Sequence, residues 1–201
     1  YGGVDGDAKV AQFRHPSGIA VDKTALIIAD RDNNTIRRFE TTTGKVTTIA
    51  GSGVKGFSDG VGVQSKLAGP EGVTVGDNGV IYIADAQNHV IRKILVSGAV
   101  QSQTKGGIGF LDGNAKTAKM AAPSGVAAWK NRVYVADTVN HAIRYIIPDQ
   151  ALVNTLAGNK TIGGKDGKGS AAQFNFPRGV AVNADGVVFV SDTGGHRLRR
   201  I

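Results

Sequence analysis

The sequence predicts an all-β propeller built from four-stranded antiparallel blades, and two recurring patterns support this fold class. In the first pattern, an apolar strand ends in Ala-Asp or Ser-Asp and is followed by a short turn and a second strand that contains Arg. In the second, a Pro-x-Gly opens a strand of small apolar residues. The four copies align at Asp30, Asp85, Asp137 and Asp192, which are separated by 55, 52 and 55 residues. A period of this length, slightly above the roughly 40 to 50 residues of common propeller repeats, makes the chain one array of blades.

Each repeat supplies four predicted strands, A to D. Strand A opens at the Pro-x-Gly, and its small residues suit an innermost strand where backbones approach closely. Strand B ends at the repeated aspartate and strand C follows the turn; both are apolar on two faces, as expected inside a stack of sheets. Strand D is predicted at residues 45–50 and 151–157, with a weaker version at 99–104. We divide the single domain 1–201 into blades at approximately 1–50, 51–104, 105–157 and 158–201.

A loop of about 19 residues joins strand D to the next strand A, which is long for an ordinary connection. Each copy carries a Gly-x-x-Asp-Gly motif whose aspartates are Asp5, Asp59, Asp112 and Asp166. Each copy also carries a large apolar residue three positions before the proline, namely Phe13, Leu67, Met120 and Phe174. We expect these apolar residues to plug the space between blades.

Together these motifs resemble the NHL repeat family, in its long variant of about 54 residues per repeat. Asn88-His89 and Asn140-His141 match the Asn-His of the family motif, whereas Asn33-Asn34 and Gly195-His196 depart from it. The resemblance covers essentially the whole chain. It implies a propeller, often six-bladed, that presents one face to protein or nucleic acid partners. We therefore expect the four visible repeats to be part of a larger propeller of about six blades.

The fourth copy stops after strand C, so the ring is not closed by this sequence. Propellers normally protect the edges of their sheets. We therefore predict an open edge at strand C of the last blade and possible self-association through it.

The repeated polar residues are predicted to be structural, because a residue needed once for chemistry is not needed in every blade. This interpretation covers the four aligned aspartates and the arginines Arg37, Arg92, Arg144 and Arg199, which we expect to bond carbonyls or those aspartates. The histidines His89, His141 and His196 occupy equivalent positions, so rotation about the axis separates them and no shared zinc site forms. No metal and no cofactor is predicted.

Strand parity places the D-to-A loops and the B-to-C turns on one face, which we call the long-loop face. Twelve of the 24 basic residues fall there, Arg31 among them, and the net charge of the chain is +8. The candidate binding residues on this face are Arg14, Lys55, Phe57, Glu71, Phe110, Lys116, Lys165 and Arg178.

The first functional hypothesis is a non-enzymatic scaffold that binds a protein partner through the long-loop face. RNA binding through the same face is the alternative; the basic charge favours it, and the scarcity of aromatic residues for base stacking weighs against it. A metal-dependent lyase or hydrolase is the third, with its site in blades outside this sequence, because Ser17, Glu71, Ser124 and Arg178 beside strand A form no His or carboxylate cluster. The chain has no cysteine and no apolar run of membrane-spanning length, so no membrane association is expected and the compartment stays open.

Overall fold

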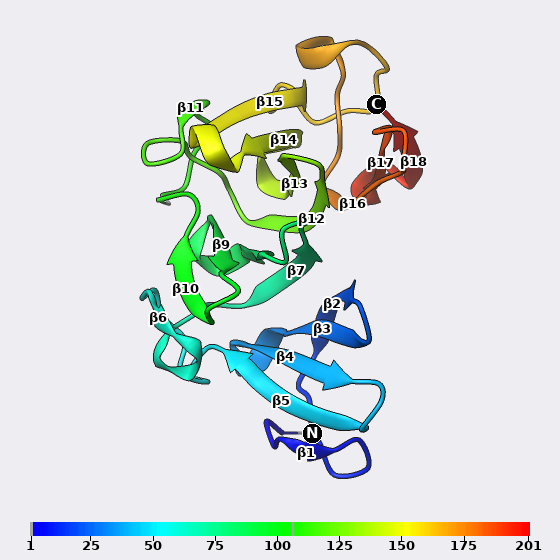
Figure 1. The fold of residues 1–201 in the computed structure, drawn as a ribbon. Coiled ribbons are helices and arrows are strands. Elements are labelled where there is room, and N and C mark those ends of the chain that lie inside the picture. Colours follow the sequence, from blue (N-terminus) through cyan, green and yellow to red (C-terminus); the bar gives the residue numbers. More distant parts are fainter. Residues whose placement is uncertain (1, 106) are drawn as a thin grey trace.

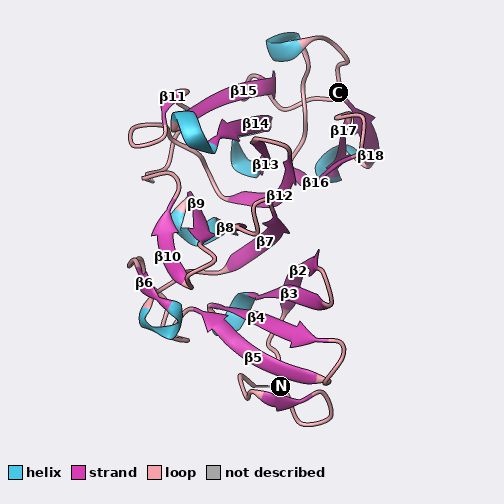
Figure 2. Cartoon of the chain, viewed as in Figure 1, coloured by secondary structure: helices cyan, strands magenta, loops and turns pink. Residues whose placement is uncertain are grey.

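Four antiparallel sheets follow one another along an arc, with their inner strands side by side (Figure 1). The computed structural model describes residues 2–105 and 107–201. Apart from strands and loops, the described part contains only 3-10 turns of three residues (Figure 2). None of these 3-10 turns is long or apolar enough to span a membrane. The predicted all-β propeller architecture is confirmed.

The predicted strands A to D are present in blades 1 to 3, and strands A to C are present in blade 4. Blade 1 contains β2 (Pro16–Asp22), β3 (Ala25–Asp30), β4 (Thr35–Glu40) and β5 (Lys45–Ala50). Blade 2 contains β7 (Pro70–Val75), β8 (Ile81–Asp85), β9 (Val90–Ile94) and β10 (Ala99–Ser102). Blade 3 contains β12 (Pro123–Trp129), β13 (Arg132–Asp137), β14 (Ala142–Ile147) and β15 (Leu152–Gly158). Blade 4 contains β16 (Pro177–Val182), β17 (Val188–Asp192) and β18 (Arg197–Arg200), and β18 forms the edge of this described three-stranded sheet.

The first three blades carry a fifth strand that the sequence analysis did not predict. It is two residues long in each blade: β1 (Gly6–Asp7), β6 (Gly60–Val61) and β11 (Gly113–Asn114). Each of these strands pairs antiparallel with the outermost strand of its own blade. They lie directly after the loop aspartates, so part of the long D-to-A loop closes the outer edge of the blade. A two-residue strand is too short to show the alternation by which strands are recognised in a sequence.

The inner strands approach one another at the glycine of the Pro-x-Gly motif. A Cβ atom on Gly72 would lie 2.2 Å from the carbonyl oxygen of Ser124 in the next blade, and one on Gly125 would lie 2.3 Å from that of Arg178. No side chain fits at such distances from backbone, so glycine is required there. This confirms the predicted close approach of backbones around the axis.

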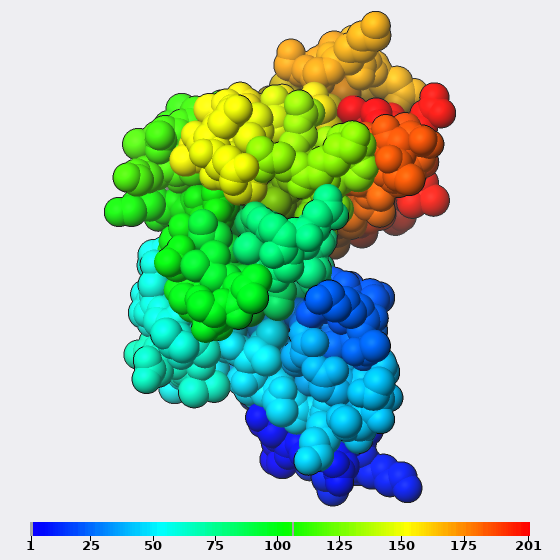
Figure 3. All heavy atoms as spheres, viewed as in Figure 1, coloured from blue at the N-terminus to red at the C-terminus, as the bar shows by residue number. Residues whose placement is uncertain are grey.

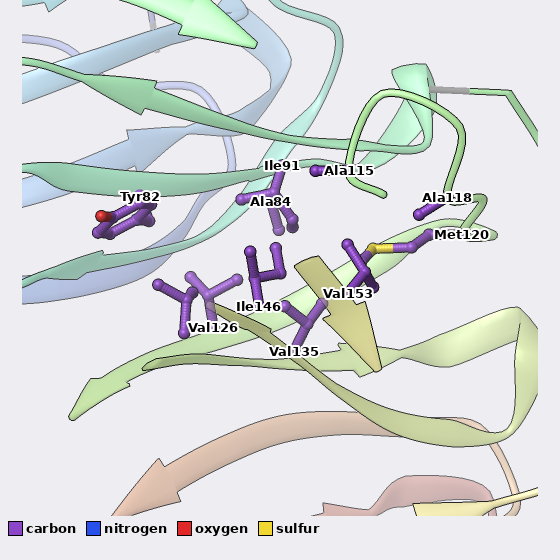
Figure 4. Close-up of a cluster of buried hydrophobic side chains, with 11 residues drawn as sticks. Tyr82, Ala84, Ile91, Ala115, Ala118, Met120, Val126, Val135, Ile146 and Val153 are labelled. Atoms are coloured by element: carbon purple, nitrogen blue, oxygen red, sulfur yellow. The ribbon is translucent and has the colours of Figure 1, made fainter. Parts of the chain in front are cut away.

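The hydrophobic core lies between the blades. Three clusters of buried side chains each join two neighbouring sheets. Figure 4 shows most of the cluster between blades 2 and 3, where Tyr82, Ala84 and Ile91 meet the facing side chains of blade 3. The apolar loop residues Leu67, Met120 and Phe174 are at most 1% exposed, as predicted for plugs, whereas Phe13 in blade 1 is only partly buried.

Candidate functional site

A buried arginine lies at the centre of blades 1, 2 and 3 beneath the long-loop face, and Arg199 takes the same place in blade 4, where it is partly exposed. In blade 3, Arg144 is fully buried and its Nη1 lies 2.7 Å from Oδ2 of Asp137, which is also fully buried. Its Nη2 donates to Oδ1 of Asp112 at 2.5 Å and to the carbonyl of Leu111 at 2.9 Å, and its Nη1 donates to the carbonyl of Lys119 at 3.1 Å. The guanidinium is therefore occupied by carboxylates and carbonyls, which are the partners that the sequence analysis expects for a structural arginine.

The repeated aspartate at the end of strand B is equally occupied. Oδ1 of Asp85 accepts the Ala68 N–H at 2.7 Å, and its Oδ2 accepts bonds from Asn88 and Arg92. Burial raises the pKa of Asp85 to about 6, and the hydrogen bonds from Asn88 and Ala68 together with the charge of Arg92 oppose that rise. Such a shift is common in catalytic acids. Asp85, however, is fully buried, and both of its carboxylate oxygens already accept hydrogen bonds from within the fold, so it cannot reach a ligand.

The loop aspartate ties the long loop to the outer strand. Asp5 accepts the backbone N–H of Thr48 at 2.9 Å and the Thr48 hydroxyl at 3.0 Å, while Arg37 donates to the same carboxylate. Burial acts to raise the pKa of Asp5, but the bonds from Thr48 and Arg37 outweigh it and hold the pKa below the ordinary value. The Asp-Gly motif of the loop is therefore part of the blade framework.

The histidines of the Asn-His turn connect each blade to the next. Nδ1 of His89 accepts the N–H of Ala122 at 3.0 Å, and Nδ1 of His141 accepts that of Phe176 at 3.1 Å. In blade 1, Oδ1 of Asn34 accepts the N–H of Gly69 at 2.9 Å in the same way. Burial lowers the pKa of His141, which favours the neutral ring that can accept this bond, and Asp192 opposes the shift. These side chains therefore join neighbouring blades, a contact that was not predicted from the sequence.

Two predicted binding residues, Phe57 and Phe110, cover buried arginines. Their rings lie 4.9 Å and 4.7 Å from the guanidinium carbons of Arg92 and Arg144, within cation–π distance. Blades 1 and 4 have glycine at the equivalent loop positions, and there the ring comes from the plug residue instead: Phe13 over Arg37 and Phe174 over Arg199, both at 4.9 Å. Every repeat therefore places one aromatic ring over its arginine. The complementary occurrence of Phe at these two positions is visible in the sequence and could have revealed this role.

The predicted basic residues do not converge on one point. Lys55, Lys116 and Lys165 are exposed in the loops of three different blades. Arg14 lines a separate groove of about 500 Å³ together with Asp5 and Asp32. These four cations present a dispersed positive surface on the long-loop face.

Glu71 and Arg178 are brought together at the mouth of the central channel. Oε2 of Glu71 lies 3.7 Å from Nη1 of Arg178, and its Oε1 lies 3.5 Å from Nη2 of Arg31. We call Arg31, Glu71 and Arg178 the mouth cluster. Arg31 is not among the binding residues predicted from the sequence, although it follows Asp30 at a position where the other repeats have Ala or Thr. The Nε of Arg31 is buried and has no hydrogen-bond partner among the described residues.

The channel wall below the mouth cluster is made of backbone and small side chains. Its cavity of about 330 Å³ is lined by the four inner strands. Ser17 donates its hydroxyl hydrogen bond to the carbonyl of Glu71 at 2.9 Å, and Ser124 donates to that of Arg178 at 2.9 Å. Both serines thus join adjacent blades. Across residues 2–105 and 107–201, no group of three or more His, Cys, Asp or Glu side chains could hold a metal ion.

Comparison with known proteins places this geometry in a family. The NHL repeat matches residues 67–94, 121–144 and 174–201. The chain is 36% identical to Protein SUPPRESSOR OF QUENCHING 1, chloroplastic, of Arabidopsis thaliana over 151 residues. The aligned region covers 69% of this chain and 14% of that protein. It is 24% identical to NHL repeat-containing protein 2 of Gallus gallus, over 97% of this chain and 40% of that protein. The chain therefore spans less than half the length of either relative.

Solved structures share the fold at low sequence identity. A protein of unknown function from Bacteroides thetaiotaomicron has a TM-score of 0.78 at 21% identity, covering 92% of this chain and 46% of that one. A virginiamycin B lyase from Staphylococcus aureus has a TM-score of 0.59 at 15% identity, covering 98% of this chain and 70% of the lyase. These similarities show a common architecture. The three matched repeats, the recurring Asp–Arg network and the similarity to NHL repeat-containing protein 2 show that the chain belongs to the NHL-repeat family.

Proposed function

We propose that this protein is a non-enzymatic scaffold that binds a protein partner through its long-loop face, with the mouth cluster at the centre of the contact. An NHL propeller is a fold that commonly mediates protein interaction. The mouth cluster adds a specific feature to that fold, because it lies where the loops of several blades meet the channel.

The observation that carries this proposal is the variation among blades at the channel mouth. The residue after the strand A proline is Ser17, Glu71, Ser124 and Arg178 in the four repeats, while the aspartate and arginine of the blade centre are the same in all four. Residues that recur in every blade are explained by the framework they build. Residues that differ at equivalent positions of a repeat are free to serve recognition.

The charges of the mouth cluster indicate what kind of partner surface fits it. Two guanidinium groups face one carboxylate, and the side chains of Arg31 and Arg178 are 42% and 58% exposed. Both contacts are long and their guanidinium groups are exposed, so each pair is weak, at about 0 to 1 kcal/mol, and either arginine can exchange Glu71 for a carboxylate of a partner. We therefore infer a partner that presents acidic side chains to the channel mouth.

RNA binding is the alternative, supported by the net charge of +8 and by the exposed Lys55, Lys116 and Lys165. Phe57 and Phe110 each have a ring face against an arginine, which leaves less aromatic surface for stacking bases. A lyase or hydrolase is the third candidate, since the fold is shared with a lyase. It would require catalytic groups from other blades, because the hydroxyls of Ser17 and Ser124 already bond backbone carbonyls.

The test compares charge reversal at the mouth with reversal at a matched site. A photo-crosslinking residue at position 139, an exposed position in the B-to-C turn of blade 3 on the same face, identifies the partner in cells of the source organism. Calorimetry then measures its affinity for the purified variants. Arg178→Glu is expected to weaken binding by tenfold or more, about 1.4 kcal/mol, as a central contact should. Lys45→Glu, at the start of β5 near the opposite face, serves as the control; Lys23 and Lys130 suit this less well because both hold left-handed backbone conformations.

Two outcomes would reject the protein-binding proposal. One is a partner whose affinity drops with Lys45→Glu and not with Arg178→Glu. The other is tight binding of a labelled mixed-sequence single-stranded RNA that weakens steeply with salt and is lost in a Lys55, Lys116 and Lys165 charge-reversal variant. That second result would establish the RNA alternative.

A further inference from the structure

A groove opens between blades 1 and 2 on the face opposite to the long-loop face, where the A-to-B and C-to-D turns lie. We call it the inter-blade groove. Its volume is about 790 Å³, and its apolar lining includes Ile49 of blade 1 and Val75, Ile81 and Ile94 of blade 2. Ligand pockets usually measure about 300 to 1,000 Å³ and combine an apolar lining with a few polar groups. In Figure 3, blade 1 is blue to cyan and the adjacent blade 2 is cyan to green. Both walls of the groove therefore belong to this chain.

The equivalent space between blades 3 and 4 is occupied by a tryptophan of the chain itself. Trp129 ends β12 and packs against the apolar cluster between these two blades. Its Nε1 donates to the carbonyl of Ala184 at 3.3 Å, and a Cβ on Gly186 would lie 2.6 Å from its ring. The Nζ of Lys130 lies 4.4 Å from the centre of the ring. A hydrogen bond, a glycine contact and a cation–π contact thus hold the indole in this junction.

The inter-blade groove contains the same three groups without the ring. The corresponding residues, counted from the strand A proline, are Lys23 for Lys130, Asp77 for Ala184 and Gly79 for Gly186. All three line the groove. Their backbones match as well, because φ is 53° at Lys23 and 49° at Lys130, and 75° at Gly79 and 86° at Gly186. The two turns that hold Trp129 between blades 3 and 4 therefore have counterparts between blades 1 and 2.

The groove is open because blade 1 lacks the aromatic residues that blade 3 places in its junction. The replacements are Asp22 for Trp129, Ile27 for Tyr134 and Arg38 for Tyr145. Asp22 and Arg38 form an ion pair at 2.5 Å, which fixes both side chains at the wall of the groove. Between blades 2 and 3, Tyr82 takes the position of Ile27, and the cavity there measures only about 260 Å³.

We propose that the inter-blade groove binds a tryptophan side chain of a partner polypeptide. The bound indole lies against Gly79, donates its N–H to the carbonyl of Asp77 and receives the ammonium group of Lys23 over its ring. These contacts repeat those that Trp129 makes within the chain. Phenylalanine and leucine side chains fit less well because neither has an N–H donor. The site lies on the face opposite to the mouth cluster, so it does not depend on the function proposed for that cluster.

The rim of the groove favours a polypeptide as the source of the indole. Val96 lies in the C-to-D turn of blade 2, lines the groove and is 79% exposed. It offers apolar surface to the residues that flank the tryptophan in its own chain, a contact that an isolated indole ring does not make.

The test is a titration of the wild-type chain with N-acetyl-tryptophan amide, followed by NMR of methyl groups. The signals of Ile81 and Ile94 should shift as the probe binds, because an aromatic ring changes the field at nearby nuclei. The signals of Ile143, which is buried between blades 3 and 4, should stay unchanged. N-acetyl-leucine amide is the matched probe and should bind about tenfold more weakly, or less. Unmoved signals of Ile81 and Ile94, or equal binding of the two amides, would overturn the proposal.

Two substitutions at one position separate filling of the groove from loss of the Asp22–Arg38 pair. Asp22→Trp supplies the ring from within the chain and should weaken probe binding by about tenfold or more. Asp22→Ala removes the same carboxylate but leaves the space open, so its affinity should stay within about threefold of wild type. Asp22→Trp should also unfold at a higher temperature than Asp22→Ala, because the ring fills the groove. Equal affinities of the two variants would reject the site, and the wild-type titration decides the question if Asp22→Trp does not fold.

Free L-tryptophan distinguishes a polypeptide site from a small-molecule site. A groove that receives a side chain of a polypeptide should bind N-acetyl-tryptophan amide at least as tightly as the free amino acid. A preference of about tenfold for the free amino acid would reject the polypeptide as the occupant and indicate a small-molecule site.

Discussion

Blades 3 and 4 have the same aspartate and arginine at their centres, yet these residues are enclosed to different degrees. Arg144 in blade 3 has a fully buried side chain, whereas the side chain of Arg199 in blade 4 is 9% exposed. The loop aspartate of blade 3 is 45% exposed, whereas Asp166 of blade 4 is 92% exposed. Thr155 of β15 anchors the loop of blade 3 by two hydrogen bonds, and the described part of blade 4 has no outer strand to do the same.

A further difference lies in the turn. Asn140 joins Asp137 to the carbonyl of Gly109 in blade 3, but blade 4 has Gly195 at the equivalent position. Arg197 partly replaces this contact by donating to the carbonyl of Gly164 at 2.9 Å. We therefore expect the contribution of the Asp–Arg pair to stability to depend on the outer strand and loop that enclose it.

The largest expected effect comes from removing the arginine of the enclosed blade. Arg144→Leu leaves Asp137 and Asp112 without their counter-charge, so the free energy of unfolding should fall by about 3 to 5 kcal/mol. Arg199→Leu also deprives the buried Asp192 of its counter-charge, but it should cost less, about 2 to 3 kcal/mol, because Asp166 remains in water and the Arg199 side chain is itself partly exposed. Urea denaturation of both variants at neutral pH measures the two values. Equal losses would show that the outer strand does not determine the strength of the pair.

The stability of the protein should depend on pH through the buried aspartates of blades 2 and 3, because burial raises the pKa of Asp137 as well as that of Asp85. A carboxyl with a raised folded-state pKa holds its proton more tightly in the folded chain, so its contribution to stability falls as the pH rises from about 4 to about 6. For Asp85, a shift from 3.8 to about 6 corresponds to about 3 kcal/mol at most. The stability of Asp85→Asn relative to wild type should therefore increase between pH 4 and pH 7.

The control for this measurement is Asp77→Asn, because Asp77 is exposed in the turn after β7. Its stability relative to wild type should stay constant over the same range. A relative stability of Asp85→Asn that is flat or declines with pH would contradict the raised pKa.

A smaller effect is expected from moving the aromatic ring that covers Arg144 from position 110 in the loop to position 120, where the plug residue lies. Phe110→Gly uncovers the guanidinium of Arg144 and should cost about 1 to 2 kcal/mol. Adding Met120→Phe gives blade 3 the arrangement of blade 4, where Phe174 covers Arg199, and should restore part of the loss. Thermal unfolding of the single and double variants provides the comparison. A double variant less stable than Phe110→Gly alone would show that the two positions are not interchangeable.

Much of the framework could be predicted from the chain alone because the same residues return in four copies. Repetition indicated the strands and pointed to a structural role for Asp137 and Arg144. It also indicated that the histidines lie at equivalent positions of successive blades, too far apart to share a metal ion. It also placed Leu67, Met120 and Phe174 between blades. Each of these inferences rests on local patterns whose periodicity can be read from the sequence without knowledge of the fold.

The sequence by itself determined the repeat, the blade order and the residues that every blade must bury. Only the tertiary structure decided which varied residues meet. It brought Arg31, Glu71 and Arg178 together at the channel mouth, used Phe57 and Phe110 to cover arginines, and left Lys55, Lys116 and Lys165 apart. The physical reason is that a contact between blades depends on rotation about the common axis and on side-chain direction, and neither is contained in the spacing of residues along one strand.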